Sequence, residues 1–206
     1  MLMMVSDRRR FRGSLDRLAA AIVRAARAGV DVVQIRERDL DDRTLTGFVR
    51  RTVVGVRGTD ARVVVNGRLD VALAAGAAGV HLRGNCLPAP RARRLAPRGF
   101  LIGRSVHSLA EARAVEAEGG CDYLVFGAVF SSTSKPAGHQ PAGLAALRQV
   151  CEAVRLPVVA IGGIDGARAS DAARAGAKGV AGIEVFATDD QRALAMSVEQ
   201  MRSAFR

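Results

Sequence analysis

The sequence predicts an α/β fold, a single-domain (β/α)8 TIM barrel that spans residues 1–206. Short β-branched runs alternate with longer Ala-, Leu- and Arg-rich stretches of helical period, and small-residue turns separate them in a regular rhythm. The chain has 206 residues, of which 49% are apolar, so it can bury one core, whereas two domains would each be small. One domain of repeated βα units is therefore expected.

Eight short apolar runs predict the strands, because strands that are buried on both faces are apolar throughout. They are residues 2–5, 32–35, 62–65, 79–82, 100–102, 123–126, 158–160 and 179–183. Helical periodicity predicts helices over residues 14–28, 69–75, 108–118, 143–154 and 167–175, and from residue 189 onward. Eight units in order favour a closed barrel over the competing architecture, a doubly wound open sheet that would bind its ligand at a switch point.

The formal net charge of +11 indicates an anionic partner, which could be a nucleic acid, an anionic lipid or a phosphorylated substrate. Nucleic-acid modules usually combine basic patches with stacking aromatic residues, but this chain has no Trp and one Tyr, and its arginines are scattered. We expect a phosphorylated small molecule and no nucleic acid. The three cysteines are far apart and form no CxxC motif, so they indicate neither a disulfide framework nor a zinc site.

The sequence contains no run of about 18 apolar residues, and its first ten residues lack the apolar stretch of a signal peptide. A cytoplasmic location without membrane contact is therefore expected. A homo-oligomer is compatible with the sequence, which does not specify the oligomeric state.

Polar side chains follow the predicted strands, at the end of a barrel where active sites form. After the second strand, alternation sends the side chains of Gln34, Arg36, Glu37 and Arg38 in turn toward the barrel mouth and toward the helices. Arginines beside a carboxylate suit anion binding and proton transfer, although a ladder of salt bridges between strand and helix is an equal alternative. Asn66 follows the third strand in the same way.

Two further polar segments follow the fourth and fifth strands. A single histidine that closes an apolar strand, such as His81, is expected to be structural. Ser105 is expected to face the mouth, whereas Ser108 and Glu111 form a capping box that starts the next helix.

The longest polar loop follows the sixth strand, and compact barrels usually use loops of this length for function. It contains Ser132, Ser134, Lys135 and His139, and hydroxyl groups beside a lysine suit phosphate oxygens. A flexible solvated loop is the alternative.

The ends of the seventh and eighth strands predict a backbone phosphate cup, which barrels commonly build there. Gly162 and Gly163 allow the chain to approach an anion, and Ile183 and Glu184 follow the eighth strand.

Together, the segments VQIRER, VVNGRLDVALAAGAAGVHL, IGRSVHSLAEA, CDYLVFGAVF, SKP and LPVVAIGGI, in this order, resemble the thiamin phosphate synthase and TenI family of barrels. The resemblance covers nearly the whole chain. It implies phosphate-binding roles for Gln34, Arg36, Arg38, Asn66, Ser105, Ser132, Ser134 and Lys135. In the synthases it also implies a magnesium pyrophosphate held by two aspartates, at positions that are Gly67 and Cys86 here.

A glycine and a thiol do not supply the oxygen ligands that magnesium prefers, so the sequence favours the metal-independent TenI chemistry. We therefore predict a thiazole tautomerase without a cofactor, in which a proton moves on a thiazole carboxylate phosphate. The TenI histidine corresponds to Ala128, so we hypothesise that Glu37, helped by His139, carries the proton. Two alternatives remain: a divergent thiamin phosphate synthase, which would need magnesium, and a noncatalytic protein that binds a thiamin intermediate. Glu184 is a further departure, because a carboxylate in the phosphate cup repels the ligand.

Overall fold

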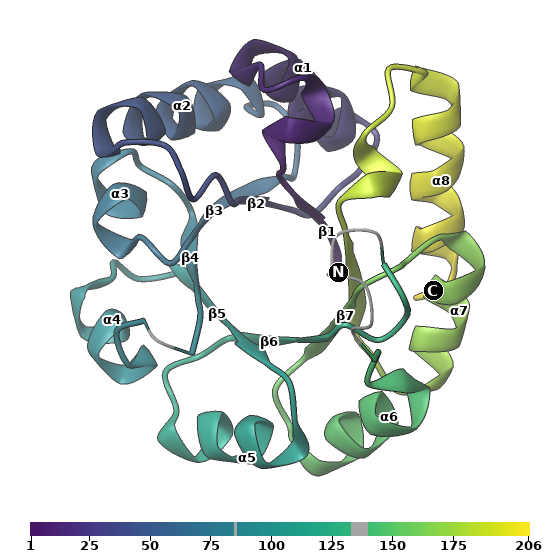
Figure 1. Ribbon diagram of the computed structural model, residues 1–206. Coiled ribbons are helices and arrows are strands. Elements are labelled where there is room, and N and C mark those ends of the chain that lie inside the picture. Colours follow the sequence, from purple (N-terminus) through teal and green to yellow (C-terminus); the bar gives the residue numbers. More distant parts are fainter. Residues whose placement is uncertain (85, 133–139) are drawn as a thin grey trace.

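The computed structural model describes residues 1–84, 86–132 and 140–206, and its strands close into a parallel barrel in sequential order. Figure 1 looks down the barrel and shows the helices as an outer ring. The strands are β1 (Leu2–Val5), β2 (Val32–Ile35), β3 (Arg62–Asn66), β4 (Gly79–Leu82), β5 (Leu101–Val106), β6 (Tyr123–Gly127), β7 (Val158–Ile161) and β8 (Gly179–Gly182). The barrel closes where β1 pairs with β8, with Met3 opposite Ala181. The predicted closed barrel is confirmed, and the open sheet is excluded.

Eight α-helices follow the strands in the described chain. They are α1 (Leu15–Arg27), α2 (Asp42–Gly55), α3 (Leu69–Ala74), α4 (Ala89–Leu95), α5 (Leu109–Glu118), α6 (Gly143–Ala153), α7 (Gly166–Arg174) and α8 (Gln191–Ser203). Short 3-10 helices η1 (Arg8–Phe11) and η2 (Glu184–Phe186) follow β1 and β8. No helix of the described segments has the length and apolar character of a membrane span.

Helices α2 and α4 were not predicted from the periodicity, and the predicted fifth strand is shorter than β5. Helix α2 starts where Asp41 accepts a hydrogen bond from the Thr44 N–H at 2.9 Å. It then buries Leu45, Phe48 and Val49 along one face. Strand β5 continues to Val106 because its polar second half still pairs with β6, even though it is no longer an apolar run.

Alternation along each strand divides the buried side chains into two layers. One layer fills the barrel interior and contains Met3, Val5, Val32, Val64, Tyr123, Val125, Val159 and Ala181. The other, larger layer packs between the strands and the helix ring and includes Phe48, Phe126 and Phe186. The side chains that continue the interior layer beyond the strand ends therefore surround the mouth.

Gly103 on β5 makes room for the ring of Tyr123, which lies inside the barrel. It pairs with Tyr123 in the strand register, and a Cβ atom at position 103 would lie 2.1 Å from the Tyr123 Cζ atom. The tyrosine ring is fully enclosed and cannot move aside without disturbing the interior layer. Gly103 is thus required for packing below the mouth.

We predict that Gly103→Ala lowers the free energy of unfolding by about 1–3 kcal/mol, because the added methyl group overpacks the barrel interior. Chemical denaturation measures this loss, and the m value should be the same as that of wild type. Gly47→Ala is the matched control: this glycine lies on the exposed face of α2 with open space around it, so the substitution should stabilise by up to about 1 kcal/mol. Equal stability of the two variants would contradict the packing argument.

Candidate functional site

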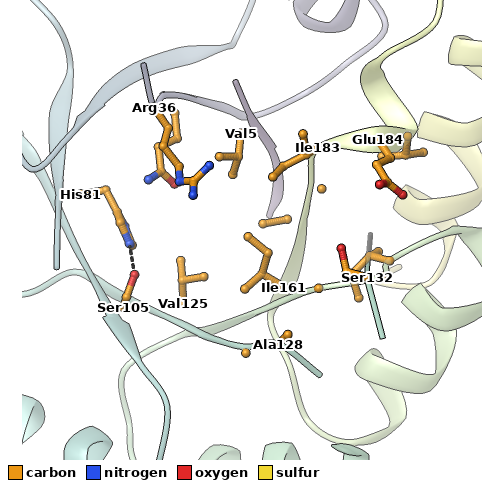
Figure 2. Close-up of a pocket in the computed structure, with 18 of the residues that line it drawn as sticks. Val5, Arg36, His81, Ser105, Val125, Ala128, Ser132, Ile161, Ile183 and Glu184 are labelled. Carbon is orange, nitrogen blue, oxygen red and sulfur yellow. Dashed lines mark hydrogen bonds between the residues drawn. The ribbon is translucent and has the colours of Figure 1, made fainter. Parts of the chain in front are cut away.

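A cavity of about 720 Å³ opens at the mouth of the barrel, where the strands end. Ten described residues that the sequence predicted for ligand binding all line it: Gln34, Arg36, Arg38, Asn66, Ser105, Ser132, Gly162, Gly163, Ile183 and Glu184. Figure 2 shows Arg36 and His81 on one side of the cavity and Ile183, Glu184 and Ser132 on the other. Ser134, Lys135 and His139 lie outside the described residues.

The first side of the mouth is cationic and is formed by Arg36, Arg38 and Arg83, which we call the arginine cluster. Arg36 and Arg38 extend β2 on the interior side, and Arg83 follows β4 directly. Partial desolvation lowers the pKa of Arg38, and the positive charges of Arg36 and Arg83 lower it further. Among the described residues, none of the three guanidinium groups forms a salt bridge. The cluster is therefore arranged for an external anion.

Neutral polar groups lie beside the arginine cluster. Gln34 Nε2 donates to Asn66 Oδ1 at 3.1 Å, which orients the asparagine amide at the end of β3. His81 is buried, with its Nε2 atom 2.8 Å from Ser105 Oγ and its Nδ1 atom 3.4 Å from the Tyr123 hydroxyl. His81 is buried and hydrogen-bonded, as expected of a structural histidine, and its ring contacts Ser105 at the cavity wall (Figure 2).

The opposite side is a backbone cup made by Gly162, Gly163, Gly182, Ile183 and Glu184, which we call the β7–β8 cup. Gly162 and Gly163 have φ values of 104° and 63°, a conformation that favours glycine. A Cβ atom at position 163 would lie 2.3 Å from the Ser131 carbonyl oxygen, so the glycine also permits close packing against the β6 loop.

The carboxylate of Glu184 was expected to repel a phosphate at this cup. In the structure it forms a salt bridge with Arg10 from η1. The arginine offsets the negative charge, so the cup can bind an anion through its backbone despite the substitution. Arg168 lies behind the cup, where its Nη1 atom donates to the Gly163 carbonyl at 2.7 Å.

Glu37 points away from the mouth, and its carboxylate is occupied by neighbouring donors. Its Oε1 atom accepts a hydrogen bond from the Ser6 hydroxyl at 2.6 Å, and both carboxylate oxygens lie 3.2 Å from the Arg8 backbone nitrogen. Arg8 also binds the exposed Asp39 through two hydrogen bonds of 2.7 and 2.9 Å. The salt-bridge alternative thus applies to Glu37 and Asp39, while Arg36 and Arg38 line the cavity.

The cavity-lining residues that were not selected from the sequence include Arg83, His107 and Arg168. Arg83 follows His81 by two positions, so strand alternation alone could have placed it at the mouth. His107 lies just beyond β5, where its Nδ1 atom is 2.7 Å from the Gly127 carbonyl oxygen. Arg168 lies within α7, and no local pattern distinguishes it from the other surface arginines.

Comparison with known proteins identifies the family. Residues 2–186 match the sequence model of the family described as thiamine monophosphate synthase. The chain belongs to this family. It is 44% identical to a thiamine-phosphate synthase of Methanoculleus marisnigri over 92% of this chain and 87% of the relative. It is 43% identical to the corresponding synthase of Anaeromyxobacter dehalogenans over 94% of this chain and 85% of the relative.

A solved structure gives the same result. Thiamine phosphate pyrophosphorylase from Pyrococcus furiosus superimposes with a TM-score of 0.83 at 33% identity, covering 99% of this chain and 94% of that chain. The prediction of a thiazole tautomerase is therefore wrong, because the matched relatives carry the synthase name. The proton-carrying role of Glu37 loses its basis with that prediction, and the geometry gives this carboxylate a structural role instead.

The magnesium site that the family resemblance implies does not fit the residues present. A Cβ atom at Gly67 would lie 3.3 Å from Arg83 Nε and 3.4 Å from Cys86 Sγ, so the Arg83 guanidinium lies beside Gly67, one of the two altered positions. Within residues 1–84, 86–132 and 140–206, no group of three or more His, Cys, Asp and Glu side chains could hold a metal ion. Magnesium requires oxygen ligands and is repelled by an adjacent guanidinium.

We predict that Glu37→Gln lowers the free energy of unfolding by about 1.5–3 kcal/mol, because buried hydrogen bonds to a charged acceptor are weakened. Binding of inorganic phosphate, measured by calorimetry, should stay within about twofold of wild type. Asp39→Asn removes a neighbouring but exposed carboxylate and should leave the free energy of unfolding almost unchanged. A stable Glu37→Gln variant that no longer binds phosphate would contradict this assignment.

The burial of the His81 imidazole leads to a prediction about how the stability depends on pH. Burial lowers the pKa of His81 from its ordinary value of 6.5 to about 3. Between these values the unfolded chain binds a proton that the folded protein excludes, so stability is lost as the pH falls below 6.5. From pH 7 to pH 5, wild type should lose about 2 kcal/mol more than His81→Gln.

Urea denaturation at both pH values measures this difference. His107→Gln removes an exposed imidazole from the same rim and serves as the control, which should keep the acid sensitivity of wild type. If His81→Gln shows the same acid sensitivity as wild type, the buried histidine is not its source.

Proposed function

We propose that this protein is a thiamine-phosphate synthase, which joins a pyrimidine diphosphate to a thiazole phosphate and releases pyrophosphate. The names of its relatives support this proposal, as does membership of the family. The observation that carries it is the presence of two separate anion-binding sides, the arginine cluster and the β7–β8 cup, on one cavity. A condensation between two phosphorylated substrates needs both.

The arrangement also suits the bond changes of this reaction. The thiazole nitrogen forms a C–N bond with its lone pair, while the C–O bond to the diphosphate breaks and its electron pair leaves with pyrophosphate. This step needs no proton acceptor, which agrees with a neutral buried His81 and with a Glu37 that faces away from the cavity. It does need positive charge near the leaving group.

The two sides would then have different tasks. The arginine cluster would bind the diphosphate and stabilise the charge that develops as it leaves. The β7–β8 cup would hold the thiazole phosphate through backbone N–H groups, and Ser132 borders the cavity on that side. Holding both substrates across one cavity brings the reacting atoms together, which itself lowers the activation barrier.

We predict that the purified protein forms thiamine phosphate and pyrophosphate from the two substrates, measured by product fluorescence and by coupled pyrophosphate release. Arg36→Gln should lower kcat/KM about 100-fold or more, because one cationic donor to the leaving group is lost. Arg94→Gln removes the same charge from the exposed face of α4, outside the cavity, and should behave as wild type. Binding of both substrates without product would instead support the noncatalytic alternative.

A further inference from the structure

Arg83 lies beside Gly67, one of the two positions at which the family resemblance implies a metal-binding aspartate. It follows β4 directly, on the side that continues from the inward-facing His81, and it lines the mouth cavity. Its Nε and Nη2 atoms lie 3.3 and 3.5 Å from the position of a Cβ atom at Gly67. Gly67 has φ of 72° and carries no side chain, which leaves this space to the guanidinium.

The Arg83 guanidinium lacks a counter-charge in the described chain. Its Nε atom is buried and has no hydrogen-bond partner among the described residues. A buried donor without an acceptor costs free energy, so this atom in the cavity wall is available to an oxygen atom of a ligand. Arg36 and Arg38 add like charges from β2, which a shared anion would offset.

The carboxylates on the same rim are engaged elsewhere. Asp165 lies on the β7 side, where it caps α7 by accepting a hydrogen bond from the Arg168 N–H at 2.9 Å. Glu184 lies on the β8 side and binds Arg10. Among the described residues that line the mouth cavity, the two carboxylates thus both belong to the opposite side, and the arginine side presents cations and neutral polar groups.

We propose that Arg83 replaces the divalent cation, so that the arginine cluster binds the diphosphate group of the substrate directly and without metal. This inference rests on the proposed function, because it names how that site holds its leaving group. A planar guanidinium donates two parallel hydrogen bonds to phosphate oxygens and stays charged at all physiological pH values. The two missing carboxylates and the unpaired guanidinium of Arg83 then have one explanation.

Binding of inorganic pyrophosphate tests this proposal without requiring turnover. Isothermal titration calorimetry of the full chain, in buffer with EDTA and no added metal, should show binding by wild type. Arg83→Gln should weaken binding about 10- to 100-fold, because one charge-assisted contact is lost. Arg94→Gln is the matched control and should bind as wild type does. Thermal unfolding of all three proteins reports whether each is folded.

Three results would overturn the proposal. In the first, wild type binds pyrophosphate only after magnesium is added. In the second, Arg83→Gln binds it within about twofold of wild type. The third is an equal loss of pyrophosphate affinity in Arg83→Gln and Arg94→Gln. Turnover with and without EDTA separates this inference from the proposed function. Synthase activity that vanishes in EDTA and returns with magnesium refutes the metal-free site alone. Metal-free pyrophosphate binding that depends on Arg83, without product from the two substrates, refutes the synthase alone.

Discussion

Closure of the parallel barrel is the constraint on which the site depends. Pairing of β1 with β8 leaves no free edge, and it brings the carboxyl ends of all strands to one rim. Residues as distant as Arg36, Ser105 and Gly163 can then face one cavity. Alternation along each strand selects which side chains point inward, so the packing that fills the barrel with Met3, Val64 and Tyr123 also aims the polar residues above them.

Charge divides this rim into two unlike halves. On the arginine side, cations meet without counter-ions in the described chain, whereas on the cup side Glu184 is matched by Arg10 and Asp165 starts a helix. The high net charge of the sequence therefore has two origins. Many arginines form ordinary surface ion pairs, such as Arg68 with Asp42 and Asp70. Arg36, Arg38 and Arg83 instead line the cavity and lack such partners among the described residues.

Local pattern was a good guide to which residues line the cavity and a poor guide to the reaction. Strand alternation places Gln34, Arg36 and Arg38 at the mouth, and it also places Glu37 on the helix side. Choosing Glu37 as a catalyst ignored that alternation. The tautomerase prediction depends on Gly67 and Cys86 as two separate missing ligands, whereas in the structure Gly67 lies beside both Arg83 and Cys86. Side chains that compensate for one another are recognised only when their positions in space are known.

The sequence by itself determined the barrel and many of the residues that line its mouth, because hydrophobic periodicity and strand alternation are local properties of the chain, and its motifs carried the family resemblance. Only the tertiary structure decided the charge balance of the site. It showed that Arg83 lies against Gly67, that Arg10 offsets Glu184, and that Glu37 is bound by Ser6 and Arg8. These contacts join residues from different βα units, and electrostatic interaction depends on distance in space, which no single segment of sequence specifies.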